Sequence, residues 1–147
     1  MTIRTYTEDD FQSIEEIYNL SKLDELAQEA AEFTLLPLSE DIPRNEQLFE
    51  SQIFVYELGS IAAFCALCHT EIRALFVHPD HRGKGIGKDL LKYLLSLTSQ
   101  EASLYVVASN CVAKEVYKSV GFVVTETFET TYNSVAVTVD KMVRNKG

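Results

Sequence analysis

The feature that most constrains the fold is a glycine-rich turn between a segment with the character of a buried strand and one with the character of a helix. The apolar run Ile72–Val77 predicts the strand. The turn reads Val77-His78-Pro79-Asp80-His81-Arg82-Gly83-Lys84-Gly85-Ile86-Gly87-Lys88. An apolar stripe at helical spacing follows, formed by Ile86, Leu90, Leu91, Leu94 and Leu95. A strand that leads directly into a helix is typical of mixed α/β domains.

The start of this helix is suited to binding an anion. Backbone N–H groups in the first turn of a helix have no partner within the helix, and the helix dipole adds partial positive charge there. Glycines let the backbone approach a phosphate oxygen closely, and Arg82 and Lys84 add positive charge nearby. The turn therefore predicts a phosphate-binding site.

Two familiar phosphate-binding motifs do not fit the spacing of the glycines. A dinucleotide fingerprint requires G-x-G-x-x-G, whereas Gly83, Gly85 and Gly87 form G-x-G-x-G, with Lys88 in the place of the last glycine. A P-loop requires four residues between its glycines and then Lys followed by Ser or Thr. Here three residues separate Gly83 from Gly87, and Asp89 follows Lys88. The spacing thus argues against a nucleotide-binding protein of either type.

A second motif lies downstream, on a segment with helical character. It reads Asn110-x-x-Ala113-x-x-x-Tyr117-x-x-x-Gly121-Phe122. Asn110 is a residue type that caps helix N-termini, and Gly121 is the type that ends helices. The motif therefore predicts a helix with a defined start and end.

Together the two motifs resemble the acetyl-CoA-binding motifs of the GNAT superfamily of N-acetyltransferases. Arg82, Gly85 and Gly87 satisfy the family's signature of Arg or Gln, two residues, Gly, one residue, then Gly or Ala. The downstream string that contains Tyr117 also looks like the family. The resemblance covers roughly residues 72–122, and the N-terminal third shares only the family's pattern of elements.

The resemblance implies a GNAT-like acyl-CoA N-acyltransferase fold, an α/β domain with a mixed sheet and the order β-α-α-β-β-β-α-β-α-β-β. We expect it to be a single domain over residues 1–147, with residues 1–60 on the acceptor side and residues 61–147 mainly on the acetyl-CoA side. The remaining expected strands are residues 3–6, 53–58, 61–68, 104–108, 122–127 and 134–143, and the remaining expected helices follow Thr7, cover residues 23–30 and lie near residues 46–50.

By the same resemblance, acetyl-CoA is the cosubstrate, and the backbone does most of the binding. Amides of the glycine-rich turn would hold the pyrophosphate, and the strand before the turn would pair with the pantetheine arm. Asn110 would hydrogen-bond pantetheine, cap its helix, or do both. The implied acetyl-CoA residues are Leu75, Phe76, Val77, Arg82, Gly83, Lys84, Gly85, Ile86, Gly87, Lys88 and Asn110.

Two residues are the main candidates for catalysis. By resemblance, Tyr117 lies near the thioester sulfur, where a phenol can protonate the departing thiolate. The attacking amine must also lose a proton, and Glu71 is a candidate general base, directly or through water. His69, His78 and His81 are further candidates, and water alone is another route. The alternative is a non-catalytic acyl-CoA-binding module on the same fold, which the presence of Tyr117 disfavours.

The net charge of −9 is distributed unevenly along the chain. Residues 1–60 hold 14 acids and 3 bases, and residues 61–147 hold 8 acids and 10 bases. So acidic a chain is a poor binder of nucleic acids. The acids either solvate surface helices or attract a cationic acceptor amine, such as a polyamine, an aminoglycoside, a lysine or a peptide N-terminus. The acids concerned are Glu25, Glu29, Glu32, Glu40 and Asp41.

The cysteines and the absence of a signal-like N-terminus indicate a cytoplasmic protein. Cys65, Cys68 and Cys111 are an odd number, which argues against a disulfide framework. Although Cys65 to His69 spells C-x-x-C-H, a strand places the two thiols on opposite faces, so we expect no haem. We also expect no metal site. We expect no association with a membrane, because no apolar run reaches the roughly 18 residues that a membrane-spanning helix needs. The sequence leaves monomer and homodimer open.

Overall fold

The structure, a computed structural model, describes residues 2–98 and 101–145. Its strands are β1 (Thr2–Thr5), β2 (Gln52–Leu58), β3 (Ser60–Cys68), β4 (Glu71–Val77), β5 (Ala102–Val107), β6 (Val123–Tyr132) and β7 (Val135–Arg144). Its α-helices are α1 (Phe11–Ser21), α2 (Ile42–Phe49), α3 (Ile86–Ser96) and α4 (Cys111–Ser119). Short 3-10 segments are η1 (Glu8–Asp10), η2 (Lys22–Leu26) and η3 (Pro79–His81).

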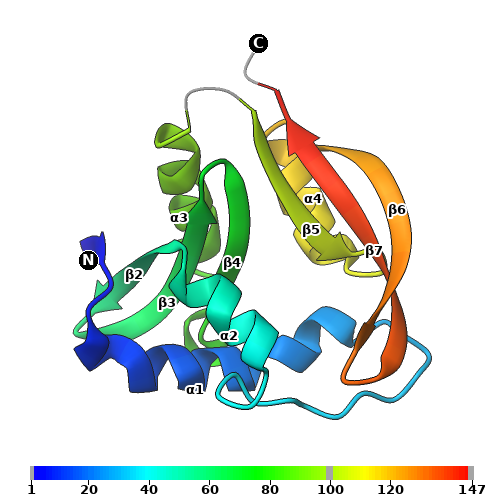
Figure 1. The fold of residues 1–147 in the computed structure, drawn as a ribbon. Helices are drawn as coiled ribbons and strands as arrows, with labels where there is room; N and C mark the ends of the chain where they lie inside the picture. The colour runs from blue at the N-terminus through cyan, green and yellow to red at the C-terminus, as the bar shows by residue number, and fades with distance from the viewer. Residues whose placement is uncertain (1, 99–100, 146–147) are drawn as a thin grey trace.

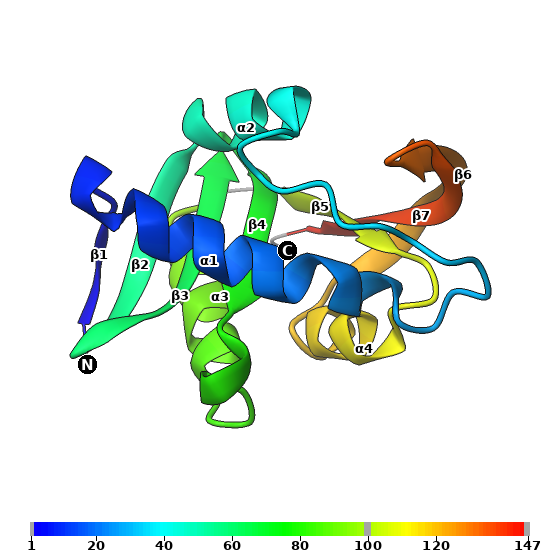
Figure 2. The ribbon, with the colours of Figure 1, turned by 90° about the horizontal axis from the view of Figure 1, so that it is seen from below.

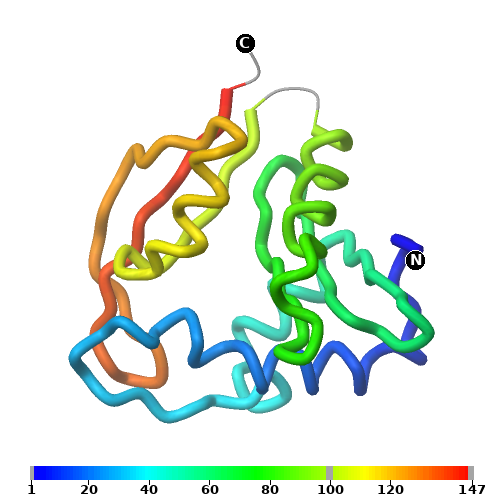
Figure 3. Tube along the Cα trace, turned by 180° about the vertical axis from the view of Figure 1, so that it is seen from behind, coloured from blue at the N-terminus to red at the C-terminus, as the bar shows by residue number. Residues whose placement is uncertain are grey.

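The strands form one seven-stranded sheet in the order β1-β2-β3-β4-β5-β7-β6 (Figure 1). Every neighbouring pair is antiparallel except β4 and β5, which are parallel. That parallel pair is short, because only Glu71 with Ser103 and Ile72 with Leu104 are in register. Beyond these residues the two strands diverge, and the sheet opens into the split visible from the front and from behind (Figures 1 and 3).

The helices cover both faces of the sheet (Figure 2). On one face, Ile14, Ile17 and Tyr18 of α1 and Leu48 of α2 pack in one apolar cluster with β2, β3 and β4. On the other face, α3 buries its apolar stripe in a second cluster, against which α4 also packs. In the described part of the chain, no helix is long and apolar enough to cross a membrane.

A β-bulge in β4 sets which side chains face which helices. Ala66 of β3 lies opposite Ala74, but its neighbour Leu67 lies opposite Ile72, so Arg73 is an extra residue in β4. Ile72 therefore packs in the cluster under α3, whereas Ala74 and Phe76 pack in the cluster under α1 and α2. A bulge bends its strand and increases the local twist. The divergence of β4 from β5 begins at this bulge.

The structure confirms the predicted mixed α/β class, and it corrects the second helix. The predicted helix over residues 23–30 is wrong, because η2 ends at Leu26. Leu26 packs in a cluster with Tyr132 and Val137 of the β6–β7 hairpin, so tertiary contacts dictate this backbone. The second α-helix is α2, which lies around the short helix predicted near residues 46–50 and includes Pro43 in its first turn.

The start of α1 is fixed by a buried carboxylate. Asp10 is 6% exposed, and it accepts hydrogen bonds from the backbone N–H of Thr7 (2.9 Å) and from both terminal nitrogens of Arg4 (2.8 and 2.9 Å). The Arg4 guanidinium, helped by the Thr7 amide, lowers the pKa of Asp10 below its ordinary value of 3.8 against the opposing effect of burial. The ionised carboxylate therefore ties β1 to the start of α1.

We predict that Asp10→Asn lowers Tm by about 5 °C at pH 7, because it removes a buried charge-assisted network. Since the folded pKa is depressed, the stabilisation is present above the unfolded pKa near 3.8 and is lost as pH falls through the folded pKa. The Tm difference from wild type should therefore shrink below pH 4 in thermal melts. Asp9→Asn removes the same charge from an exposed neighbour and should change Tm little. Equal effects of the two variants would contradict this assignment.

Candidate active site

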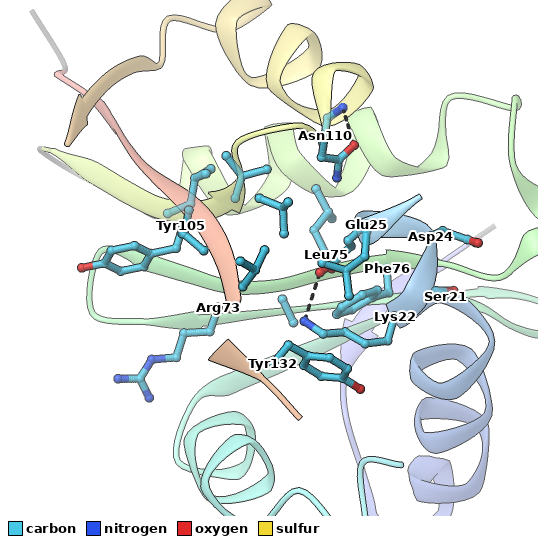
Figure 4. Close-up of a pocket in the computed structure, with 18 of the residues that line it drawn as sticks. Ser21, Lys22, Asp24, Glu25, Arg73, Leu75, Phe76, Tyr105, Asn110 and Tyr132 are labelled. Carbon is cyan, nitrogen blue, oxygen red and sulfur yellow. Dashed lines mark hydrogen bonds and ion pairs between the residues drawn. The ribbon is translucent and has the colours of Figure 1, made fainter. Parts of the chain in front are cut away.

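A cavity of about 1160 Å³ lies where β4 and β5 separate. Its lining draws on both faces of the sheet, with Tyr117 of α4 on one face and Leu48 of α2 on the other. Figure 4 shows residues from β4, η2 and the β6–β7 hairpin, with the α4 cap Asn110, around the same space. A molecule in this cavity can therefore reach from one face of the sheet to the other.

The end of β4 offers backbone groups along the cavity. Leu75, Phe76 and Val77, the residues expected to pair with pantetheine, line it. Their edge toward β3 is paired, but the edge toward β5 has no partner strand after Ile72. The backbone groups on that open edge can hydrogen-bond an extended ligand in the manner of an added strand.

The glycine-rich turn lies at one end of this strand and forms the start of α3. Gly83 and Gly85 adopt positive φ angles of 78° and 80°, which side-chain-bearing residues rarely adopt. We find no hydrogen bond from the backbone N–H groups of residues 83–88 to any described residue. The side chains here are mostly exposed, although that of Ile86 is buried in the core. The turn thus presents free amides at a helix N-terminus, which is the arrangement that binds phosphate.

Arg82 makes several contacts within the protein, and its predicted role in acetyl-CoA binding stays a prediction. Its guanidinium bonds the carboxylate of Asp24 (2.6 Å), the hydroxyl of Ser21 (3.1 Å) and the carbonyl of Val77 (3.3 Å). Its backbone N–H donates to the carbonyl of Pro79 (3.4 Å). The side chain therefore fastens the end of α1 and η2 to the end of β4. Ser21 and Asp24 were not predicted from the sequence, because no residue near them in the chain indicates that they contact Arg82.

Tyr117 and Asn110, the two residues singled out in the downstream motif, lie on the α4 side of the cavity. The Tyr117 ring packs edge-on against Phe122, and burial raises the pKa of its hydroxyl, with Glu25 contributing in the same direction. We find no hydrogen bond from this hydroxyl to a described residue. Asn110 caps α4 through its Oδ1, which accepts from the Ala113 N–H (3.4 Å). This leaves the side-chain N–H groups of Asn110 without a partner in the described chain.

Glu71 also lines the cavity, at the first residue of β4. One of its carboxylate oxygens accepts a hydrogen bond from Arg73 (3.2 Å), and Arg73 also pairs with Glu50. The second oxygen of Glu71 has no hydrogen-bond partner among the described residues. The three histidines do not line the cavity. Their role as alternative bases stays a prediction.

The face under α1 and α2 supplies cavity residues that sequence reasoning did not single out. Tyr18, Lys22, Arg44 and Tyr132 line this part. The Lys22 ammonium pairs with Glu25 (3.0 Å) and lies 5.3 Å from the centre of the Tyr132 ring. In the sequence, Tyr18 has the spacing of a buried helix residue, and Lys22 and Arg44 are single charges outside any motif. Neither indicates a site.

Most acidic residues of the first 60 positions do not line the cavity. Of the five acids considered as attractors of a cationic acceptor, only Glu25 lines it, and Glu25 is paired with Lys22. Glu29 hydrogen-bonds the hydroxyl of Ser109 in the connection between β5 and α4. The acids therefore act in part as ties between segments of the protein.

Comparison with known proteins connects this geometry to a chemistry. The family described as the acetyltransferase (GNAT) domain matches residues 49–124. The L-amino acid N-acyltransferase MnaT of Escherichia coli strain K12 is 35% identical over 71 residues. This match spans 46% of the present chain and 41% of that protein, so it covers less than half of either.

Solved structures share the fold over almost the whole chain. A GCN5-related N-acetyltransferase from Rhodopseudomonas palustris gives a TM-score of 0.81 at 19% identity, covering 98% of this chain and 94% of that one. The putative acetyltransferase yncA from Salmonella typhimurium, solved with its cofactor acetyl-CoA, gives 0.73 at 21% identity, covering 100% and 94%. At these identities the likeness shows the fold.

We predict that Arg82→Gln loosens the attachment of η2 to β4. Loss of its three side-chain contacts should lower the free energy of unfolding by about 1 kcal/mol and speed amide hydrogen exchange in residues 21–26 by about tenfold. Lys84→Gln removes an equal charge from an exposed position in the same turn and should leave that exchange unchanged. Faster exchange spread evenly over the protein would contradict a local attachment.

Proposed function

The chain belongs to the GNAT acetyltransferase family, and from this premise we propose that it transfers the acetyl group of acetyl-CoA to a primary amine. The observation that carries the proposal is the cavity at the split between β4 and β5, which has free helix-start amides near one end and a tyrosine hydroxyl in its wall. Structures of the same fold that hold acetyl-CoA support this choice of cosubstrate. The part of the chain that matches the E. coli N-acyltransferase is consistent with an amine as the acceptor.

Different groups of the protein would bind different parts of the cosubstrate. The free amides of residues 83–88 would hold the pyrophosphate, while the open edge of Leu75, Phe76 and Val77 would pair with the pantetheine arm. The unpartnered side-chain N–H groups of Asn110 would donate to the same arm. Residues before position 60 contribute most of the opposite side of the cavity, which would receive the acceptor.

Tyr117 would act as the general acid. The amine nitrogen attacks the thioester carbonyl carbon, the C–S bond breaks, and the departing thiolate takes the phenolic proton of Tyr117. A phenol of ordinary pKa 10 is protonated at neutral pH, and burial raises the pKa of Tyr117 further, so this side chain has a proton to give. The ring contact with Phe122 holds the side chain in place for this step.

The attacking nitrogen must lose one proton, and Glu71 is the group that we propose to accept it. Glu71 lies in the cavity wall, and Arg73 holds only one of its two carboxylate oxygens. Transfer through a water molecule requires no direct contact between Glu71 and the amine. In the alternative function, an acyl-CoA-binding module, the cosubstrate binds but neither Tyr117 nor Glu71 has a chemical task.

Acetyl-CoA should stabilise the protein, whereas ATP and NAD should not. At 100 times its Kd, a ligand adds about 2.7 kcal/mol to the free energy of unfolding, which a thermal shift assay readily detects. Gly85→Asp should abolish the shift, because it places a carboxylate at the proposed pyrophosphate site. Gly59→Asp is a matched control, since Gly59 has a similar φ of 76° in a distant hairpin with open space around it. A shift with ATP alone, or an unaltered shift in Gly85→Asp, would rule out this binding site.

Tyr117→Phe should reduce kcat by about 100-fold and leave the KM for acetyl-CoA nearly unchanged, because it removes only the proton donor. The measurement is thiol release with a panel of primary amines. Tyr105→Phe, which removes the hydroxyl of an exposed tyrosine that also lines the cavity, should retain activity. Full activity of Tyr117→Phe would exclude it as the acid. Acetyl-CoA binding without thiol release for any amine would favour the non-catalytic alternative.

A further inference from the structure

We infer that the acceptor amine also carries a carboxylate, which Arg44 and the Tyr18 hydroxyl bind on the α1–α2 face of the cavity. This inference rests on the proposed acetyl transfer and names the class of its acceptor. It favours an α-amino acid, or a similar small amine with an acid group, over the cationic acceptor that the acidic N-terminal segment predicted.

Among the charged residues that line the cavity, one basic side chain has no acidic residue of the lining as its partner. The wall contains four basic side chains and three acidic ones. Each acid is paired with a different base, in the pairs Lys22–Glu25 (3.0 Å), Arg73–Glu71 (3.2 Å) and Arg82–Asp24 (2.6 Å). The remaining base is Arg44, and we find no hydrogen bond or ion pair of its guanidinium with any described residue. Arg44 is therefore the one base of the described cavity lining without an acidic side-chain partner, although the Asp41 carboxylate lies near it and accepts from the Arg44 backbone N–H (3.3 Å).

The Tyr18 hydroxyl is a second polar group without a partner at the same place. Tyr18 is 2% exposed, lines the cavity and has a buried hydroxyl oxygen that makes no hydrogen bond in the described structure. A buried hydroxyl without a partner is destabilising, so its presence is informative. Burial raises the pKa of this hydroxyl, Arg44 acts against that rise, and Glu25 and Asp41 act with it. By contrast, the Tyr132 hydroxyl is already engaged by the backbone of Leu36.

A carboxylate satisfies both groups at once. The planar guanidinium of Arg44 can donate two parallel hydrogen bonds to a carboxylate, and the Tyr18 hydroxyl can donate a further one. In a partly desolvated cavity these charge-assisted bonds are stronger than in water. A second ammonium on the acceptor, as in a polyamine, would instead meet an uncompensated guanidinium. The residues thus select for an acidic group beside the amine.

The location of Arg44 fits the direction in which the acceptor must lie. Arg44 belongs to the first turn of α2 and Tyr18 to α1, and both helices cover the face opposite the one that carries Tyr117. An acceptor with its carboxylate at Arg44 can point its amine toward the split between β4 and β5. Leu48 and Phe76 line the same part of the cavity and supply apolar surface for the rest of the molecule.

The test compares acceptors that differ only in the acid group. A panel of L-amino acids is assayed by thiol release beside the matching α-amides and decarboxylated amines, for example L-leucine, L-leucinamide and 3-methylbutylamine, with spermidine as the cationic acceptor. The amino acids that react should be preferred over their amides by about 10- to 100-fold in kcat/KM. An α-amide has the more easily deprotonated amine, so its lower rate cannot come from amine protonation.

Variants test whether Arg44 and Tyr18 cause the preference for acceptors that carry a carboxylate. Arg44→Gln should raise the KM for amino acids by about 10- to 100-fold, change the amides by less than about threefold, and leave the KM for acetyl-CoA unchanged. Tyr18→Phe should act in the same direction but more weakly. Lys118→Gln removes one positive charge from the exposed surface of α4 and should alter none of these values. Equal rates for acids and amides, a preference for spermidine, or an equal loss on all acceptors in Arg44→Gln would overturn the inference.

A binding measurement keeps this test separate from the failure of acetyl transfer. N-acetyl-L-amino acids and their amides are titrated calorimetrically into protein saturated with CoA, which requires no turnover. Binding of the acids that exceeds binding of the amides by about tenfold or more, and that disappears in Arg44→Gln, supports the carboxylate site even if no thiol is released. Absence of any carboxylate-dependent binding across the set overturns it, whether or not amines are acetylated.

Discussion

β4 and β5 run parallel for only two residue pairs, Glu71 with Ser103 and Ile72 with Leu104, and then separate. Both strands remain paired on their outer sides, β4 with β3 except at the bulge and β5 with β7, so each half of the sheet remains intact. The opening leaves backbone groups of β4 without a partner strand in the interior of the protein. Unpaired polar backbone groups of this kind are normally satisfied by a partner or by solvent. The split is therefore both the space for a ligand and the reason that a ligand with polar groups fits there.

The two halves of the sheet share only the short ladder between β4 and β5, so other contacts must hold them together. The N-terminal segment provides these contacts. Arg82 fastens the end of α1 and η2 to β4, and the next residues reach the other half, where Leu26 packs in a cluster with Tyr132 and Glu29 bonds Ser109. This segment runs across the open end of the split in Figures 1 and 2. Because it crosses from one half to the other, it also brings its own side chains into the cavity wall.

The sequence predicted the parts of the site that depend on local backbone geometry. The glycine-rich turn and the cap at Asn110 need only a few consecutive residues, and both lie where the motifs place them. The bulge at Arg73 was not predictable, because one extra residue in an apolar run changes the register without changing the composition. Tyr18 has the spacing of a core residue, and its unpartnered hydroxyl becomes apparent only when its neighbours are known.

Some parts of the site were predictable from the sequence and others were not, because the two ends of the cavity would bind their ligands in different ways. In the proposed function, the cosubstrate end uses backbone amides, whose positions follow from glycines and from the start of a helix, so a short motif is enough to specify them. The proposed acceptor end uses side chains from α1, η2, α2 and the β6–β7 hairpin, which meet only in the folded protein. In this proposal, substitutions at these positions change the acceptor and leave the cosubstrate site intact. The residues around Arg44 would then carry information on the acceptor that the shared motifs cannot contain.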